Sequence, residues 1–252
     1  MEYFAIFTVC VISGVFTGLL GIGGGLIIVP AFLSILPLFG VKHFSLHEII
    51  GISATCVFFN SLSSLYYRRK EKFLPEKLMT KLLIFIMVGT AIGAYYSSFA
   101  PYKLLLSIYI VICVISGFLL KKDIQVEIKN KTLMFALYIS FAGIGALGAS
   151  IGIGGAILFT TALKCFLEKS TKELLPSITL IVAIHAMVAF GVKLYNNDVT
   201  LMIVPIAILS SLVGAKIGVT ISRKLSSNAI SNLMIITLVV ALTRVTIELF
   251  KP

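Results

Sequence analysis

The sequence predicts an all-α polytopic membrane protein made of two repeated halves. Three observations support this prediction: the composition, the lengths of the uncharged runs, and a glycine-rich block that occurs twice. Of the 252 residues, 59% are hydrophobic and only 12% are charged. Soluble domains contain about 45–50% apolar and about 25% charged residues, and disordered chains contain still fewer apolar residues. The composition therefore excludes both of these classes.

The net charge of +11 would suggest nucleic-acid binding if the protein were soluble. Here 20 of the 21 basic residues fall in short hydrophilic gaps or near the ends of apolar runs, where Lys and Arg mark the cytoplasmic face of a membrane protein. We therefore expect a multi-pass protein of the cell membrane, with the lipid bilayer and no nucleic acid as its partner. The four cysteines form no metal-ligand pattern, so we expect no metal and no cofactor.

Uncharged runs locate the membrane-spanning segments. Eight such runs cover residues 3–41, 49–67, 82–102, 104–120, 132–163, 174–192, 199–215 and 225–243. Six of them are 17–21 residues long, which suits one helix across a hydrocarbon core about 30 Å thick. The runs 3–41 and 132–163 are longer, with 39 and 32 residues, and each carries a glycine block near its middle. We expect each long run to form a glycine-broken helix or a hairpin.

The glycine blocks show that the chain is duplicated. Residues 14–25 read GVFTGLLGIGGG and residues 145–156 read GALGASIGIGGA, so that a shift of 131 residues superposes four glycines. Downstream of the blocks, a shift of 125 residues superposes other pairs, namely Glu48 with Glu173, Asn60 with His185, and Arg68 with Lys193. An internal repeat of half the chain length sets the domain organisation. It comprises a first transmembrane repeat (1–120), a charged cytoplasmic linker (121–131) and a second transmembrane repeat (132–252).

The relative orientation of the two halves has two solutions. If each long run crosses the membrane once, the halves are parallel and the basic residues divide 13 cytoplasmic to 7 outside, leaving aside the intramembrane Lys216. If each long run dips in and returns, the halves are inverted and the division becomes 15 to 5. The positive-inside rule favours the inverted arrangement. The cytoplasmic segments would then be 68–81, 121–131, 164–173 and 222–227.

The two glycine blocks are candidates for a substrate site. Glycine permits the backbone to unwind, and unwound backbone in a membrane is tolerated only where it is buried in protein or lines a cavity. Half-helices at such a break point their amides at anions in transporters with inverted repeats. The alternative role is close helix packing, which we expect instead for the pairs Gly89/Gly93 and Gly214/Gly218.

Polar side chains inside the spans add to this site. Asn60 and His185 each lie twelve residues after the aligned glutamates, which is roughly the middle of a span. Thr55 and Thr179 precede them on the same helices. Polar groups in a membrane are costly and often functional, although a lone histidine can also be a packing residue. The ten acidic residues all lie in loops or near segment ends, which favours an anion or a neutral solute over a cation.

Two motifs of soluble enzymes also occur in the second glycine block. Residues 143–148 match the dinucleotide pattern GxGxxG, but they lack the strand–turn–helix context that this pattern requires. Residues 148–152 match GxSxG, so an intramembrane serine hydrolase using Ser150 and His185 remains an alternative of another class. Because glycine-rich repeats produce such matches easily, we expect the protein not to be an enzyme.

The first glycine block, with its downstream proline, resembles a known family. The motif reads Gly14-xx-Thr17-Gly18-xx-Gly21-Ile22-Gly23-Gly24-Gly25-xxxx-Pro30. Together with the second block and the Gly89 and Gly214 elements, it is similar to the TauE/SafE family of sulfite and organosulfonate exporters. The resemblance spans nearly the whole chain, and the second copy departs from it at Ala156 and Thr161. It implies transport of a small sulfur-containing anion, such as sulfite, thiosulfate or sulfoacetate.

These observations lead to the hypothesis of a secondary transporter. A small anion would bind near the midplane, with backbone amides of the glycine breaks and side chains of the second and sixth regular spans around it. The predicted substrate-binding residues are Gly23, Gly24, Gly25, Thr55, Asn60, Gly154, Gly155, Ala156, Thr179 and His185. An anion channel and a transporter of another small anion remain open, and the sequence is compatible with a homo-oligomer.

Overall fold

The structure is a computed structural model of the chain that describes residues 2–40, 44–121, 131–152, 155–167 and 169–250. Over these residues the regular secondary structure is helical, and eight helices are long and apolar enough to cross a membrane. They are α1 (Glu2–Leu20), α3 (Leu46–Arg68), α4 (Glu76–Ser97), α5 (Tyr102–Lys121), α6 (Lys131–Ser150), α8 (Thr171–Tyr195), α9 (Val204–Lys224, after the 3₁₀ turn Leu201–Ile203) and α10 (Ser227–Leu249). The predicted all-α polytopic fold is confirmed.

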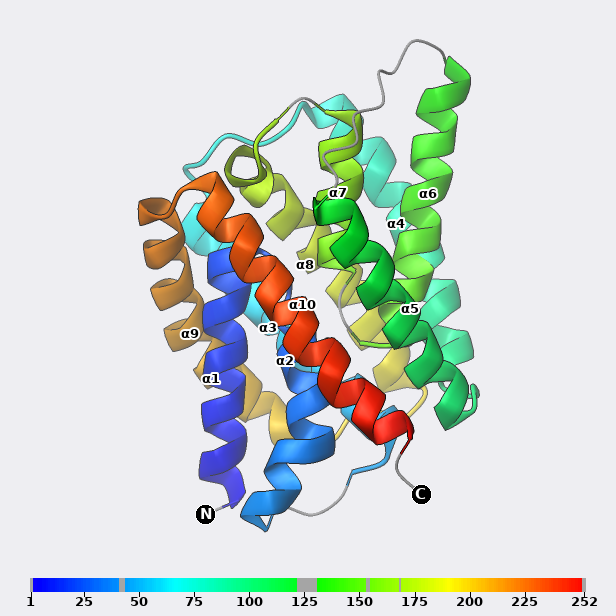
Figure 1. Cartoon of the computed structure of the whole chain (residues 1–252), viewed down its shortest axis with the longest axis vertical. Coiled ribbons are helices and arrows are strands. Elements are labelled where there is room, and N and C mark those ends of the chain that lie inside the picture. Colours follow the sequence, from blue (N-terminus) through cyan, green and yellow to red (C-terminus); the bar gives the residue numbers. More distant parts are fainter. Residues whose placement is uncertain (1, 41–43, 122–130, 153–154, 168, 251–252) are drawn as a thin grey trace.

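Short apolar helices follow α1 and α6. The first, α2 (Gly25–Pro30), continues through a π turn (Ala31–Ile35) and a 3₁₀ turn (Leu36–Phe39), and the second is α7 (Ala156–Phe166). In Figure 1 the chain rises along α1 and descends along α2, and it descends along α6 and rises along α7. Each long uncharged run therefore forms a hairpin of one long and one short helix, which is one of the two expected forms.

The path of the chain is compatible with inverted halves. The N- and C-termini lie at the same end of the molecule, and α3 and α8 run in opposite directions (Figure 1). The end of α3 meets the end of α9 where Arg68 bonds to Ser222, and the segment after α3 meets the start of α8 where the backbone N–H of Leu74 donates to Ser177 Oγ. The described residues of 68–81, 164–173 and 222–227 thus gather at one end, which we call the basic end.

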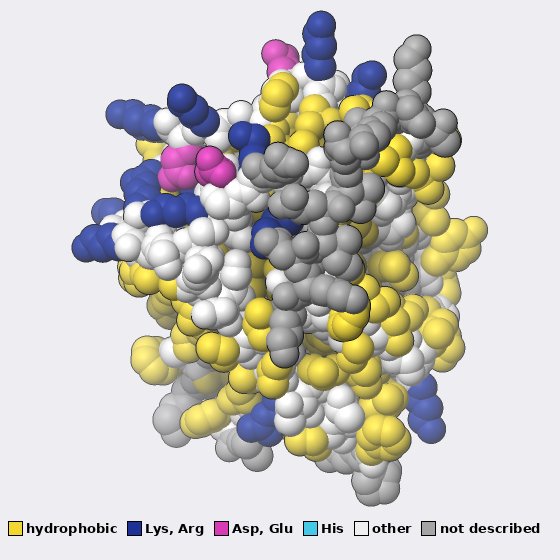
Figure 2. All heavy atoms as spheres, turned by 45° about the horizontal axis from the view of Figure 1, so that its top comes forward, with side chains coloured by type: hydrophobic (Ala, Val, Ile, Leu, Met, Phe, Trp, Pro, Cys, Tyr) yellow, Lys and Arg dark blue, Asp and Glu magenta, His cyan; other side chains and the backbone are white. Residues whose placement is uncertain are grey.

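Figure 2 shows Lys and Arg side chains concentrated at the basic end. This is the distribution on which the predicted orientation depends, because basic residues accumulate on the cytoplasmic side. Most of the predicted linker, residues 122–130, lies outside the described residues. The inverted orientation and the linker's cytoplasmic location therefore stay predictions.

Helices α3 and α8 begin with the same capping box and form the centre of the bundle. Ser45 Oγ accepts a hydrogen bond from the backbone N–H of Glu48, whose carboxylate accepts one from the N–H of Ser45. Ser170 and Glu173 repeat this pattern at the repeat-equivalent positions. Such boxes satisfy backbone donors that a helix start leaves unpaired. The two helices pack against each other, and they are the most buried of the eight spans.

The closest helix pairs join opposite halves. Helix α1 of the first half packs along α9 of the second. A Cβ atom added to Gly18 would lie 2.5 Å from the carbonyl oxygen of Ala215, and one added to Gly214 would lie 2.5 Å from that of Val11. Because no side chain fits between the two backbones, these glycines set how closely the helices approach.

The second cross-half pair is α4 with α6, which is the repeat equivalent of the first. A Cβ atom on Gly89 or Gly93 would overlap the backbone of Ala142 or Ala146. The expected packing role of Gly89/Gly93 and Gly214/Gly218 is therefore confirmed. The first helix of each half, α1 or α6, packs against a helix of the other half, so the two halves interlock.

Replacing Gly218 by alanine should lower the melting temperature, because the new Cβ would overlap the carbonyl oxygen of Val15 and push α9 away from α1. We expect a loss of about 1–3 kcal/mol, as for other overpacked contacts. The matched control is Gly191→Ala on α8, where a Cβ meets open space and helix propensity should add about 0.5–1 kcal/mol. Thermal unfolding followed by circular dichroism separates the two variants, and equal melting temperatures would contradict this role for Gly218.

Candidate functional site

The first glycine break covers residues 21–24, between α1 and α2. Gly21, Gly23 and Gly24 have φ angles of 70°, 76° and 73°, a left-handed conformation that residues with a Cβ adopt only at a cost. At the end of α1 the backbone N–H of Gly21 donates to the carbonyl oxygen of Thr17 at 2.8 Å. The glycines therefore allow the chain to stop one helix and reverse within four residues.

Helices α3 and α8 cover this break from both sides. A Cβ atom on Gly23 would lie 2.9 Å from the side chain of Val57 on α3. One on Gly21 would lie 3.2 Å from Leu175 and 3.6 Å from the hydroxyl of Thr179, both on α8. The Thr179 hydroxyl donates to the carbonyl oxygen of Leu175 at 2.7 Å. Thr179 thus lies beside the break, and the break is tightly packed.

Asn60 reaches the same break through Ser13. The side-chain amide of Asn60 donates to Ser13 Oγ at 3.1 Å, and that hydroxyl donates to the carbonyl oxygen of Gly24 at 3.3 Å. Asn60 Oδ1 is buried and has no hydrogen-bond partner among the described residues. Buried polar atoms are nearly always paired in folded proteins, so this oxygen marks a place where a further donor would be favourable.

The second glycine break lies between α6 and α7. Gly152 and Gly155 have φ angles of 70° and 60°. Ser53 on α3 donates its hydroxyl hydrogen to the carbonyl oxygen of Gly152 at 2.6 Å. Helix α7 starts at Ala156, directly after Gly155, whereas the predicted site residue Gly154 lies outside the described residues. The second break therefore touches α3, just as the first touches α8.

His185 lies beside the second break and is almost completely buried. Its Nδ1 shares a hydrogen bond of 2.7 Å with the hydroxyl of Thr90 on α4, and its ring packs edge-on against Phe159 on α7. A cavity of about 10 Å³ is lined by Ala54, Val57, Gly148, Ala149, Gly152, His185, Ala186 and Ala189. A space of this size suits a single water molecule at most, so the surroundings of His185 are closely packed.

The predicted site residues fall into two neighbouring groups. Gly23, Gly24, Gly25, Asn60 and Thr179 lie at the first break, and Gly155, Ala156 and His185 lie at the second. Val57 borders both groups, since it contacts Gly23 and lines the small cavity. The hydroxyl of Thr55 donates to the carbonyl oxygen of Gly51, one turn earlier on α3. Substrate binding by these residues stays a prediction.

Ser150 and His185 bond to different partners. The hydroxyl of Ser150 donates to the carbonyl oxygens of Ala146 and Gly93, at 2.8 and 3.2 Å. His185 bonds to Thr90 instead. These contacts do not form the nucleophile–base pair that a serine hydrolase needs.

The basic end is hollowed by a cavity of about 590 Å³. Six basic and two acidic residues line it, namely Arg68, Lys70, Lys72, Lys169, Lys172 and Arg223, with Glu71 and Glu173. Charges of one sign around a concave surface raise the local concentration of the opposite ion. The cavity therefore favours anions.

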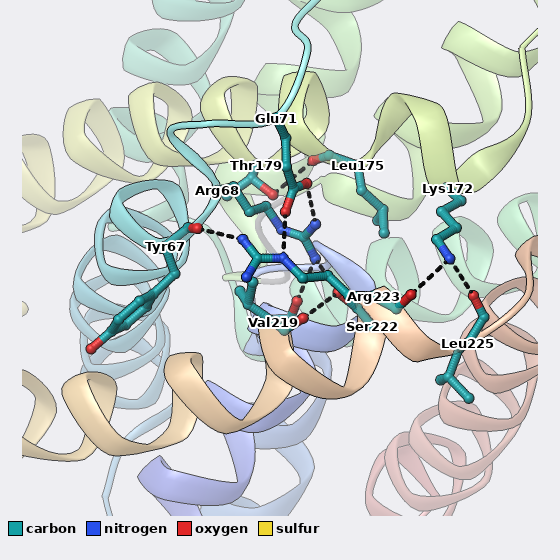
Figure 3. Close-up of polar contacts among 11 residues, drawn as sticks. Tyr67, Arg68, Glu71, Lys172, Leu175, Thr179, Val219, Ser222, Arg223 and Leu225 are labelled. Carbon is teal, nitrogen blue, oxygen red and sulfur yellow. Dashed lines mark hydrogen bonds and ion pairs between the residues drawn. The ribbon is translucent and has the colours of Figure 1, made fainter.

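Arg68, the last residue of α3, links this cavity to the end of α1. Its side chain is only 2% exposed, and it donates to Glu71 Oε2 at 2.8 Å, to Ser222 Oγ at 2.7 Å and to the carbonyl oxygen of Gly18 at 2.6 Å (Figure 3). Leu175 lines the cavity and also packs against Gly21. Leu175 thus lies next to both the basic cavity and the first glycine break.

The opposite end of the bundle carries an equivalent cluster. Lys193, the repeat counterpart of Arg68, is fully buried near the end of α8. Its ammonium group donates to Asp198 Oδ2 at 3.0 Å and to Ser98 Oγ, at the end of α4, at 2.9 Å. Each central helix thus ends in a buried cation that bonds to an acidic residue after the same helix and to a serine of the other half.

Sequence reasoning missed the basic cavity and the role of Arg68. The signal was the alignment of Arg68 with Lys193, which places equivalent cations at the ends of equivalent helices. A basic residue at the end of a span is more simply interpreted as a marker of the cytoplasmic side. The contacts that distinguish Arg68 join residues 50 and 154 positions apart in the chain, and no local pattern reveals them.

Comparisons with known proteins match this architecture. The family model described as sulfite exporter TauE/SafE matches residues 6–245. The chain is 24% identical over 244 residues to the "Probable membrane transporter protein YdhB" of Bacillus subtilis (strain 168), covering 94% of this chain and 97% of that protein. It is 24% identical over 263 residues to the "Probable membrane transporter protein YunE" of the same organism, covering 95% of each chain. No solved structure gives a significant match.

Proposed function

This chain belongs to the sulfite exporter TauE/SafE family of membrane transporters, and from that premise we propose that it is a secondary transporter of a small sulfur-containing anion. Sulfite, thiosulfate and organosulfonates such as sulfoacetate are the proposed substrates. The basic end is proposed to face the cytoplasm, in line with the positive-inside rule.

The observation that carries this proposal is the position of the basic cavity above the first glycine break. The cavity of about 590 Å³ is lined in part by Leu175, which also packs against Gly21. An anion attracted by the six basic residues would therefore bind near a break whose glycines can adopt more than one backbone conformation. Such breaks near the centre of a membrane protein are typical of substrate sites in transporters.

Close packing at the first break and beside His185 supports alternating access over a channel. Val57 lies against the first break, and the cavity beside His185 has a volume of only about 10 Å³. We propose that a small anion passes when α3 and α8 move relative to the breaks. We propose that backbone amides at 23–25 and 154–156 then bind its oxygens, with Thr55, Asn60, Thr179 and His185 completing the site.

Purified protein in liposomes tests this function by uptake of radiolabelled sulfite, thiosulfate and sulfoacetate. We expect saturable uptake of at least one of these anions, accelerated by the same anion on the other side of the membrane. Asn60→Ala and His185→Ala should each reduce this uptake about tenfold or more, because each removes a polar contact worth at least 1.4 kcal/mol in a desolvated site. Lys103→Gln, an exposed change at the start of α5, is the control.

The possible outcomes test the transport mechanism, the site residues and the substrate class separately. Unsaturable uptake without exchange would indicate a channel. Uptake that survives both Asn60→Ala and His185→Ala would remove these side chains from the site and leave the glycine amides. A complete lack of uptake for all three anions would contradict the proposed substrate class.

A further inference from the structure

We infer that the basic cavity is a binding site for a small oxyanion in solution, with the Nε–H of Arg68, one of the lining residues, as a donor. This inference deepens the proposed function, because it assigns the anion a first binding site that is separate from the two glycine breaks. It rests on the bonding of one buried guanidinium group, on the charges around it, and on a carboxylate that now bonds to it (Figure 3).

The guanidinium group of Arg68 is held in one orientation, and one of its three nitrogens makes no hydrogen bond to the described residues. Its Nη1 donates to Glu71, and its Nη2 donates to Ser222 and to the carbonyl oxygen of Gly18. Its Nε is buried and has no hydrogen-bond partner among the described residues. Because the guanidinium is planar and rigid, fixing two of its nitrogens also fixes the direction of the third. An oxyanion oxygen is a suitable acceptor for such a donor.

The surrounding side chains leave the cavity positive. Glu71 is shared between Arg68 and Arg223, to which it bonds through Oε2 and Oε1 at 2.8 and 3.1 Å (Figure 3). Lys172 donates to the backbone carbonyl oxygens of Arg223 and Leu225, so these bonds orient its ammonium without neutralising its charge. The carboxylate of Glu173 accepts hydrogen bonds from Ser170 at the start of α8.

The carboxylate of Glu71 occupies the guanidinium groups to which an anion would bind, and so competes with it. Its carboxylate lies against both guanidinium groups of the cavity, at 24% exposure, and a negative charge there repels a second anion. Removing that charge should weaken the native contacts of Arg68 and at the same time strengthen anion binding. A purely structural Arg68–Glu71 pair would show only the first effect, so Glu71→Gln distinguishes the two roles.

Equilibrium binding of radiolabelled sulfite to the detergent-purified full chain tests the site without any transport step. We expect Arg68→Lys to weaken binding about tenfold and Arg68→Gln to weaken it further, whereas Glu71→Gln should tighten binding about tenfold, which corresponds to 1.4 kcal/mol. Lys224→Gln is the matched control, since it removes an exposed positive charge from the same end, outside the cavity lining.

Several results would overturn the inference. One is a Glu71→Gln protein that binds sulfite no better than the wild type, and this arm decides the matter even if Arg68→Gln fails to fold. Another is an equal loss in Lys224→Gln, which would indicate a general charge effect. A third concerns lipid headgroups, which also present an oxyanion: if only phosphatidylglycerol in nanodiscs, and not sulfite, stabilises the protein in an Arg68-dependent way, the site belongs to a lipid.

Binding and uptake measurements together distinguish a failure of the proposed function from a failure of this inference. Sulfite binding that depends on Arg68 and strengthens in Glu71→Gln, without uptake into liposomes, would support the site and contradict the transport. Uptake at the wild-type rate and half-saturating concentration in a folded Arg68→Gln protein would contradict the site and keep the transport.

Discussion

Replacing Gly24 by alanine should abolish anion uptake, whereas the same replacement at Gly40 should leave it intact. Both glycines have left-handed backbones, with φ angles of 73° and 75°, so both variants bear a conformational cost of about 1–2 kcal/mol. Only at Gly24 would the new Cβ also overlap the hydroxyl of Ser13 and lie 2.7 Å from the hydroxyl of Thr17. At Gly40 it would meet no atom within 4 Å.

The comparison of these two alanine variants isolates the packing of the first break from the strain of its backbone. Uptake of the transported anion into liposomes gives the functional result, and circular dichroism melts show whether each variant is folded. If Gly24→Ala retained wild-type uptake, the tight fit between α1 and the start of α2 would have no role in transport. If both variants lost uptake equally, backbone strain alone would explain the loss.

Replacing Asp198 by asparagine should destabilise the protein by about 3–5 kcal/mol, the range found when one partner of a buried ion pair is removed. Lys193 is fully buried and bonds to Asp198 Oδ2 at 3.0 Å, so the substitution leaves its ammonium group without the carboxylate charge. The double variant Lys193→Met/Asp198→Asn should recover most of the loss, because it removes the buried charge as well. Unfolding of both single variants and the double variant forms a double-mutant cycle.

The exposed ion pair at the other end supplies the control for this cycle. Arg223 bonds to Glu71 at 3.1 Å with 53% of its side chain exposed, and exposed pairs contribute about 0–1 kcal/mol. Arg223→Gln should therefore change the melting temperature little. Strictly additive effects of Lys193→Met and Asp198→Asn would show that the two residues do not depend on each other.

The sequence predicted the helices well because membrane crossings follow simple rules. Run length and the absence of charge identify the spans, and the glycine blocks at 14–25 and 145–156 indicated where the chain breaks. The fold class depends on these local properties alone. Small residues at Gly89 and Gly93 likewise indicated a packing face, since a helix face without side chains must approach another backbone.

The contacts between distant segments were beyond prediction. The pattern of Gly214 and Gly218 shows that their helix has a close neighbour, but it does not identify α1 as that neighbour. Asn60 and His185 were placed near the middle of their spans, yet the pairing of His185 with Thr90 depends on how α4 packs against α6 and α8. Arg68 required three contacts from other segments, and its sequence context resembles that of any basic residue at a membrane boundary.

The interlocking of the two halves has a consequence for biosynthesis. The ribosome makes α1 before it makes the packing partner α9, and five of the eight described long helices lie between them in the chain. The face of α1 that carries Gly14 and Gly18 therefore lacks its native neighbour α9 until α9 has been made. Assembly of inserted helices is a separate stage of membrane-protein folding. For this chain, that stage can reach completion only after α9 has left the ribosome.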